Sequence, residues 1–220
     1  MIKSKKIFPN LIFMGPPGVG KGTIAAIIAD EYQLVHLSTG NVFRAEISSK
    51  SELGLKVAKI VESGGYVPDD ITNEIVKKAL DFYSSQGKIV ILDGYPRTIS
   101  QSEFLDSIPN FNYEVIELHA PDDLILKRLN GRRFCPNCKA SFHVDFMPST
   151  KGNYCDKCDS ELMTRKDDSL ESIKKRQEVY KSQTEPLLNY YSEKGNIHTF
   201  DASGNAENTA HLIVKTIEHL

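Results

Sequence analysis

Residues 15–23 read Gly-Pro-Pro-Gly-Val-Gly-Lys-Gly-Thr, directly after the apolar run Leu-Ile-Phe-Met at 11–14, and this stretch decides the fold. A buried strand, a glycine-rich turn and a helix start in this order form a phosphate cradle, because the glycines let backbone N–H groups turn inward. The helix N-terminus adds positive potential, and Lys21 can reach the outer phosphates. The general pattern has Ser or Thr directly after the lysine, whereas Gly22 stands there and Thr23 follows. The segment therefore predicts a phosphate-binding loop (P-loop) of a narrower group, in preference to a glycine turn that binds nothing.

The composition indicates a globular protein with one sizeable core and smaller insertions. The chain has 220 residues, of which 40% are hydrophobic and 25% charged. A net charge of -2 gives no general attraction to nucleic acid or anionic membranes, and no apolar stretch approaches the length of a membrane span. The basic start is followed by a run broken at Pro9, which favours a first strand over a signal peptide. We expect a cytoplasmic monomer without nucleic-acid or membrane partners.

Arginine is scarce, which makes its positions informative. Only seven of the 27 basic residues are arginine, and nearly all of these lie in recognisable motifs. The planar guanidinium binds phosphate through two parallel hydrogen bonds, which the ammonium group of lysine cannot do. Codon bias would explain the scarcity but not this placement. The candidate phosphate ligands are Arg44, Arg97, Arg128, Arg132, Arg133, Arg165 and Arg176.

Short apolar runs alternate with longer amphipathic segments. The strand-like runs are 11–14, 34–37, 88–92, 113–118 and 197–200. The helical patterns are 22–32, 69–85, 122–131, 170–194 and 205–220. This alternation predicts an α/β fold of three layers with a central parallel five-stranded sheet, and a ligand crevice at the carboxyl ends of its strands.

Two regions interrupt the alternation and are interpreted as inserted flaps on one P-loop core. Helix follows helix within 39–67, and cysteine pairs, aromatic residues and turn formers fill 132–168. We call 39–67 the helical insertion and 132–168 the lid. The core would then consist of residues 1–38, 68–131 and 169–220.

The lid contains every cysteine of the chain, in two Cys-x-x-Cys pairs separated by 16 residues. Cys135, Cys138, Cys155 and Cys158 match the spacing of a structural Zn²⁺ site, in which four thiolates form a tetrahedral shell. The segment between the pairs has few apolar residues, so the metal would supply much of its folding energy. Disulfides are the main alternative, and a reducing compartment disfavours them. A catalytic zinc is disfavoured because four sulfurs leave no open position for a substrate.

Four further motifs accompany the P-loop. They are Leu37-Ser-Thr-Gly40 with Arg44, Leu92-Asp-Gly-Tyr-Pro-Arg-Thr98 with Gln101, Arg128 with Gly131-Arg-Arg133, and Thr164-Arg-Lys-Asp-Asp168 with Arg176. From about Leu11 to Phe200, the chain resembles the adenylate kinases, specifically their long-lid, zinc-bearing bacterial form. The resemblance implies reversible, Mg²⁺-dependent phosphoryl transfer from ATP to AMP, giving two ADP. It also implies that the helical insertion binds AMP and that the lid is a zinc ribbon.

The resemblance implies a role for each matched position. ATP would be bound by Gly18, Val19, Gly20, Lys21, Gly22, Thr23, Arg128, Arg132, Ser141, Phe142 and Gly204. AMP would be bound by Thr39, Arg44, Gly65, Tyr66, Val67, Gly94, Tyr95, Pro96, Arg97, Gln101, Arg165 and Arg176. The catalytic set would be Lys21, Asp93, Arg97, Arg132, Arg165 and Arg176. Within these sets Arg44 would grip the AMP phosphate, Gln101 would read the adenine edge, and Asp93 would hold magnesium.

Some positions depart from the family pattern or have competing interpretations. Asn41 stands where the family usually has aspartate, Ile24 replaces glutamine, Tyr95 replaces phenylalanine, and Asp70 replaces glutamate. None of these changes removes a phosphate ligand. Asp93 could instead cap the turn after its strand. Asp167 and Asp168 could orient neighbouring arginines or provide the N-cap of the long helix.

Two other functions compete with the adenylate kinase hypothesis. One is a kinase of UMP or CMP, although such kinases usually have asparagine at the position of Thr98 and a short lid. The other is a nucleic-acid-binding P-loop ATPase with a zinc ribbon. Such modules surround the ribbon with basic and aromatic residues, whereas here Asp145, Asp156, Asp159 and Glu161 offset the lysines.

Overall fold

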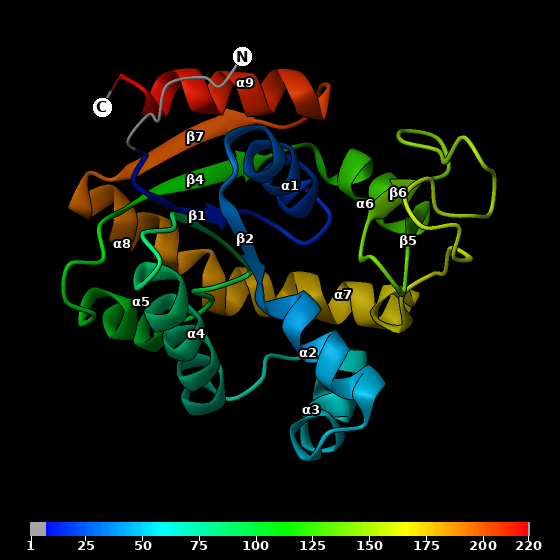
Figure 1. Cartoon of the computed structure of the whole chain (residues 1–220), viewed down its shortest axis with the longest axis horizontal. Coiled ribbons are helices and arrows are strands. Elements are labelled where there is room, and N and C mark those ends of the chain that lie inside the picture. The colour runs from blue at the N-terminus through cyan, green and yellow to red at the C-terminus, as the bar shows by residue number, and fades with distance from the viewer. Residues whose placement is uncertain (1–7, 220) are drawn as a thin grey trace.

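The computed structural model describes residues 8–219 and shows a parallel five-stranded sheet with strand order β2-β3-β1-β4-β7 (Figure 1). Residues 1–7 and 220, which the predicted core and last helix include, lie outside the described part. The elements are β1 (Asn10–Met14), α1 (Lys21–Tyr32), β2 (Val35–Ser38), α2 (Thr39–Ser49), α3 (Glu52–Glu62), α4 (Asp69–Ser84), β3 (Val90–Asp93), α5 (Ile99–Asp106), β4 (Tyr113–His119), α6 (Asp122–Asn130), β5 (Arg132–Phe134), β6 (Ser141–His143), η1 (Lys166–Asp168), α7 (Leu170–Val179), η2 (Tyr180–Thr184), α8 (Pro186–Lys194), β7 (Ile197–Asp201) and α9 (Ala206–Ile217).

The central strand β1 is apolar on both faces because helices cover both sides of a parallel sheet. In β1, residues Leu11, Ile12, Phe13 and Met14 are all buried, as expected for a strand covered on both sides. In the register of the sheet, Phe13 in β1 and Ser38 in β2 both lie opposite Asp93. The predicted five-stranded parallel sheet is confirmed, with strand ends displaced by one or two residues.

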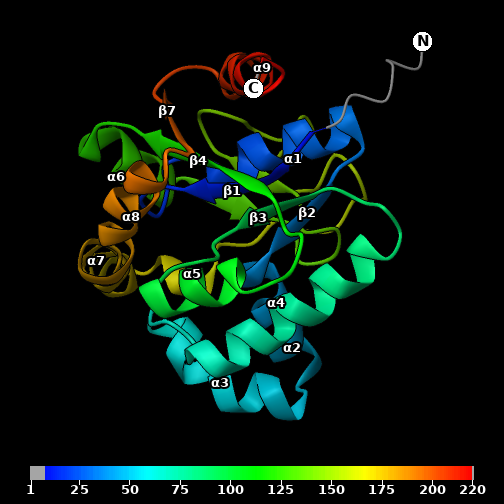
Figure 2. The same ribbon diagram turned by 90° about the vertical axis from the view of Figure 1, so that its left-hand side faces the viewer.

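Helices cover both faces of the sheet, which confirms the three layers. One face packs against α1 and α9, with Ile28 and Ile213 fully buried between the layers. The other face packs against α4, α5 and α8, through residues such as Leu105 and Leu187. Figure 2 shows α1 and α9 on one side of the strands and α4 and α5 on the other. Within residues 8–219, none of the helices combines the length and apolar character needed to cross a bilayer.

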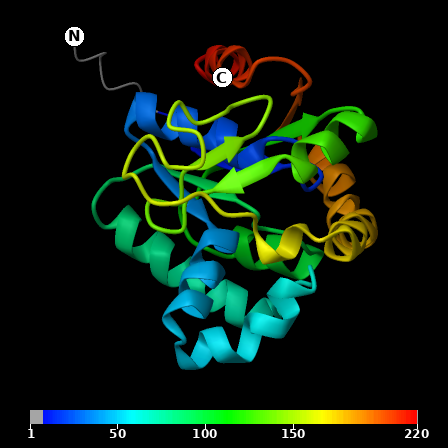
Figure 3. The same ribbon diagram turned by 90° about the vertical axis from the view of Figure 1, so that its right-hand side faces the viewer.

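Figure 1 shows the lid beyond one end of the strands and the helical insertion below the sheet, and in Figure 3 the lid faces the viewer. In the helical insertion, α2 packs against α3 around a small core formed by Phe43, Val57 and Val67. In the lid, the antiparallel hairpin of β5 and β6 pairs Arg133 with Phe142. The lid's core consists of only three buried residues, Cys135, Phe142 and Cys155.

The helical pattern predicted over 170–194 is confirmed, but the geometry is not α-helical throughout. The helix changes to π geometry at η2, where the N–H of Glu185 donates to the carbonyl of Tyr180 at 2.9 Å, and α8 then starts at Pro186. Proline has no N–H for an α-helical bond, and π segments often coincide with functional sites. Here the wider turn places Thr184 against the central cavity.

Gly15 fixes the P-loop against the core. Its φ is +132°, and a Cβ atom at this position would lie 2.3 Å from the carbonyl oxygen of Leu118 in β4. No side chain fits this approach, so the glycine lets the chain leave β1 and turn beside the carboxyl end of β4.

We predict that Gly15→Ala lowers the free energy of unfolding by about 3 kcal/mol or more, because backbone strain and overpacking each cost about 1–3 kcal/mol. Gly87→Ala is the matched control: its φ is also positive (+63°), but nothing lies within 4 Å of the added atom. That variant should lose only about 1–2 kcal/mol, the conformational term alone. Urea unfolding of both variants measures the difference, and equal losses would contradict the role of Gly15.

Candidate active site

A cavity of about 1150 Å³ lies at the carboxyl ends of the strands. The P-loop, the ends of β2 and β3, the helical insertion, the lid and η1 all contribute to its wall. The volume exceeds the usual range for one drug-sized ligand, about 300–1000 Å³. All residues predicted to contact nucleotides line it except Tyr95, whose side chain is fully buried.

The P-loop wraps the start of α1. Gly18 and Gly20 have φ values of +91° and +119°, and α1 begins at Lys21. The Nζ of Lys21 donates to the carbonyl oxygens of Gly15 at 2.6 Å and Pro16 at 3.0 Å. The loop therefore presents the free N–H groups of a helix start beside a buried ammonium group, which is an arrangement suited to phosphate.

Burial and neighbouring charge change the pKa of Lys21. Loss of solvent and the charges of Arg97, Arg176 and Arg132 together lower its pKa to about 7, while the charge of Asp93 opposes the shift. A phosphate at the mouth of the loop would favour the charged ammonium form.

Asp93 lies at the end of β3, facing the P-loop. Burial alone would raise its pKa, but a hydrogen bond from His36 and the charges of His36 and Lys21 lower the pKa to about 2. The His36 Nε2 and Asp93 Oδ2 atoms are 3.2 Å apart. A Cβ atom at position 22, where the chain departs from the general P-loop pattern, would lie 3.2 Å from Asp93 Oδ2 and would have to displace that carboxylate slightly. Asp93 is thus an ionised acceptor beside the loop, a suitable ligand for a hydrated divalent cation.

Two buried carboxylates hold three of the arginines. Arg176 Nη1 lies 3.1 Å from Asp167 Oδ2 and 3.3 Å from Asp168 Oδ1. Arg132 Nε donates to Asp168 Oδ2 at 2.8 Å, and Arg44 Nη1 lies 3.8 Å from Asp167 Oδ2. The carboxylates therefore orient arginines.

The competing interpretation of these two aspartates, as an N-cap, is wrong. The N-cap of α7 is Ser169, whose Oγ accepts from the N–H of Ser172 at 3.2 Å.

Arg165 has too few partners for its depth. Its Nε is buried without a hydrogen-bond partner, and its guanidinium lies 5.6 Å from the ring centroid of Phe134. Burial lowers the pKa of Arg165 well below its usual value, and the charges of Arg132 and Arg44 add to the effect. A buried guanidinium nitrogen without a hydrogen-bond partner, close to other arginines, suits a site for an anion.

The wall beside the helical insertion is tied together by hydrogen bonds. Thr39 Oγ1 donates to the carbonyl of Gly94 at 2.8 Å, and Arg97 Nε donates to the same oxygen at 2.6 Å. Arg44 Nη2 donates to Asn41 Oδ1 at 2.8 Å, so the neutral Asn41 orients Arg44 without neutralising it. The Arg97 guanidinium lies 4.8 Å from the ring centroid of Tyr66.

Sequence reasoning missed several residues of the cavity. Thr184 Oγ1 accepts from Tyr66 Oη at 2.8 Å and donates to the Arg97 carbonyl at 2.9 Å. Phe146 lies with its ring centroid 6.0 Å from the Arg128 guanidinium. His36 could have been found from the sequence, because it is a polar residue within an apolar strand. It lies two positions before Ser38 and hence on the same face of β2 as Ser38. No sequence signal marks Thr184, because its position depends on the π segment.

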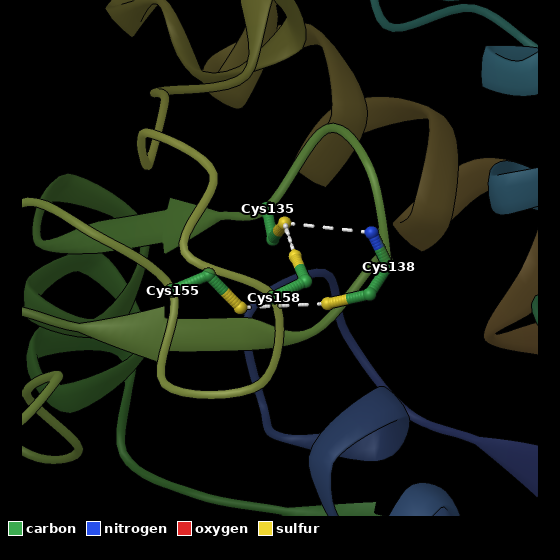
Figure 4. Close-up of side chains that lie close together, drawn as sticks. All are labelled: Cys135, Cys138, Cys155 and Cys158. Atoms are coloured by element: carbon green, nitrogen blue, oxygen red, sulfur yellow. Dashed lines mark hydrogen bonds between the residues drawn. The ribbon is translucent and has the colours of Figure 1, made fainter.

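The four cysteines meet in the lid (Figure 4). All four Sγ atoms lie within 4.8 Å of one another, and the Cys135–Cys158 and Cys138–Cys155 sulfurs are each 3.4 Å apart. A tetrahedral zinc with bonds of about 2.3 Å needs sulfurs about 3.8 Å apart. The cluster therefore fits a tetrahedral metal of this size, and all four cysteines are unpaired.

The sheet order, the P-loop at its centre and the cationic cavity define a P-loop protein that binds phosphorylated small molecules. The sequence model of the family described as adenylate kinase matches residues 13–196. The chain belongs to the adenylate kinase family.

Curated relatives named adenylate kinase agree with this assignment. The relative from Mycoplasmopsis pulmonis is 52% identical over 199 residues, which cover 90% of this chain and 93% of the relative. The relative from Mycoplasma mobile is 43% identical, with 94% of this chain and 97% of the relative covered. The relative from Treponema denticola is 44% identical, with 90% of this chain and 94% of the relative covered.

We predict that ATP binding at pH 8 takes up close to one proton. With a pKa of about 7, Lys21 is about 10% charged at pH 8 in the free protein. Phosphate contact raises that pKa, so the amine binds a proton when ATP binds. Isothermal titration calorimetry in two buffers of different ionisation enthalpy measures the uptake.

Two variants control this experiment. Lys21→Met should abolish the uptake, whereas Lys88→Met, which changes an exposed lysine, should retain it. Unchanged uptake in Lys21→Met would assign the proton to another group.

Proposed function

We propose that this chain catalyses the reversible transfer of the γ-phosphoryl group of ATP to AMP, giving two ADP. Membership of the adenylate kinase family supports this function. The single structural observation that carries it is the meeting of Lys21, Arg97, Arg132, Arg165 and Arg176 around one cavity. Their charges repel one another until a polyanion occupies the space between them.

The proposed ATP site comprises the P-loop, α6, the lid and the loop before α9. Lys21 leaves its two carbonyl partners and binds the outer phosphates. Arg128, which donates to the Val19 carbonyl at 2.7 Å and the Ser203 carbonyl at 3.3 Å, lies over the adenine. The remaining contacts are assigned to the P-loop backbone and to Ser141, Phe142 and Gly204, all on the cavity wall.

The proposed AMP site lies between the helical insertion and β3. Arg44 and Arg97 bind the AMP phosphate, and Gln101 reads the base. Val67 and Gly65 supply the wall beside it. Tyr95 acts through the scaffold only, because its hydroxyl donates to Asn73 Oδ1 at 2.7 Å and to the Gln101 carbonyl at 3.2 Å.

Transfer requires two phosphates in line and cations at the equatorial oxygens of the moving group. Arg132, Arg165 and Arg176 supply those cations, and an oxygen of the AMP phosphate is the attacking atom. The bond to the ADP leaving group breaks as the bond to AMP forms, so no proton acceptor is essential. Water must be excluded, and closure of the lid and helical insertion over both substrates would achieve this.

Magnesium would be held with ATP by Asp93, whose ionised carboxylate faces the P-loop. The cation would neutralise charge on the β- and γ-phosphates. Lys21 and the arginines would bind the oxygens that the cation leaves free.

We further propose that the three sequence regions act as a core, an AMP-binding insertion and a lid, in a cytoplasmic monomer. All cationic groups assigned to the site come from one chain. Four cysteines used as metal ligands suit a reducing compartment.

A coupled assay with four acceptors tests the function. With ATP and Mg²⁺, the purified protein should phosphorylate AMP with a kcat/KM at least about 100-fold above those for UMP, CMP and GMP, because hydrogen-bonding sites reject mismatched bases strongly. Preference for UMP or CMP would establish the pyrimidine kinase alternative.

Arg97→Lys assigns that activity to this cavity. Lysine keeps the positive charge but lacks the planar guanidinium group that binds phosphate through two hydrogen bonds. We therefore expect kcat to fall by about 100-fold or more, while the melting temperature stays close to that of the unchanged protein. Undiminished turnover would remove Arg97 from the site.

We propose Zn²⁺ as the metal of the four-cysteine cluster, with a structural role. The lid's buried core is small, so four metal–sulfur bonds would contribute a large part of its stability. The cluster's closed shell leaves no position for chemistry.

Metal analysis should find about one zinc per chain, and a chelator should lower the melting temperature of the unchanged protein. Cys155→Ser should lose the metal and become insensitive to the chelator. Thr164→Ala, a change at an exposed lid residue away from the cysteines, should keep both properties. Finding the cysteines in disulfides, with no metal present, would overturn the zinc proposal.

A further inference from the structure

The side-chain amide of Gln101 is held at both ends. Its Nε2 donates to Asp69 Oδ1 at 2.6 Å, and its Oε1 accepts from the backbone N–H of Arg97 at 2.7 Å. Gln101 is only 1% exposed and lines the cavity. The protein therefore fixes this amide before any base arrives.

Its two partners also determine which way round the amide lies. A carboxylate is only an acceptor and a backbone N–H is only a donor. Reversing the amide would set its oxygen against the Asp69 carboxylate and its NH₂ group against the Arg97 N–H. The orientation follows from the chemistry of the partners, which is the basis on which amides are assigned.

Asp69 is itself held in place. It is the first residue of α4, where the helix dipole favours a carboxylate. Its Oδ2 accepts from Thr98 Oγ1 at 2.8 Å, and the same hydroxyl oxygen accepts from the N–H of Gln101 at 3.2 Å. The Thr98 hydroxyl proton is thereby directed at Asp69.

We propose that Asp69 is a positioning residue that sets the base specificity of the monophosphate site. With one N–H of Gln101 used by Asp69 and one lone pair used by Arg97, one donor and one acceptor remain. In the fixed orientation they match the N1 acceptor and the N6 donor of adenine. A 6-oxopurine presents the opposite pattern, an N1–H donor and an O6 acceptor, and needs the reversed amide that Asp69 forbids.

This inference rests on the proposed AMP site, and Asp69→Asn tests it. Asparagine has nearly the same shape but offers both a donor and an acceptor, so the reversed Gln101 amide gains a partner at that end. We expect the KM for AMP to rise about tenfold and the ratio of kcat/KM for AMP to that for IMP to fall at least about tenfold. The KM for ATP should change less than about twofold, since Asp69 has no part in the ATP site.

Asp70→Asn is the matched control, because it removes the same charge from the same helix turn at an exposed position. It should leave both KM values and the AMP to IMP ratio unchanged. Calorimetric binding of AMP and of IMP without ATP gives a second readout that is independent of turnover. If Asp69→Asn does not fold, Thr98→Val replaces it, because valine lacks the hydroxyl that donates to Asp69. Thr98→Val should lower the AMP to IMP ratio, whereas Thr98→Ser, which keeps a hydroxyl, should retain the ratio of the unchanged protein.

The outcomes separate the two proposals. If the unchanged protein does not prefer AMP to IMP and GMP, the AMP assignment itself fails. If it does prefer AMP but Asp69→Asn keeps the full ratio, the role of Asp69 is overturned while the proposed function stands. An equal fall in kcat/KM for AMP and for IMP would also overturn the role of Asp69 in specificity, since that result indicates a purely structural role for Asp69.

Discussion

Repulsion among cations gathered in one cavity is the constraint on which the rest of this structure depends. Burial and neighbouring cations lower the pKa of Lys21 to about 7 and that of Arg176 to about 10. Asp93, Asp167 and Asp168 offset part of this charge, and Asp167 and Asp168 also hold Arg176 and Arg132 in position. The free protein therefore keeps a preorganised set of donors whose electrostatic cost an incoming polyphosphate would relieve.

The parallel sheet makes this gathering possible. All five strands end at the same edge, so the P-loop after β1 and Asp93 at the end of β3 become neighbours. Close packing against β4 leaves no room for a side chain at Gly15, and a side chain at Gly22 would press on the Asp93 carboxylate. The stability of the core and the geometry of the phosphate site thus depend on the same contacts.

The remaining cations come from segments that the sheet alone does not place. The helical insertion contributes Arg44, while the lid contributes Arg132 and Arg165. The lid's buried core contains two of its four cysteines, which links the proposed metal to the position of these arginines. The proposed adenine site is preorganised in the same way, because Asp69 and the Arg97 N–H fix the orientation of the Gln101 amide before a base binds.

The sequence by itself determined the sheet and the P-loop, and all residues that it predicted to contact nucleotides, except Tyr95, line the cavity. Those features depend on local patterns: apolar runs, glycine spacing, paired cysteines and arginines within motifs. It failed where the outcome depends on contacts between distant segments. The π segment that positions Thr184, the His36–Asp93 pair and the carboxylate that orients Gln101 arise only from packing. Only the tertiary structure decided them, because their hydrogen-bond partners lie 32 to 118 residues apart and leave no periodic trace in the chain.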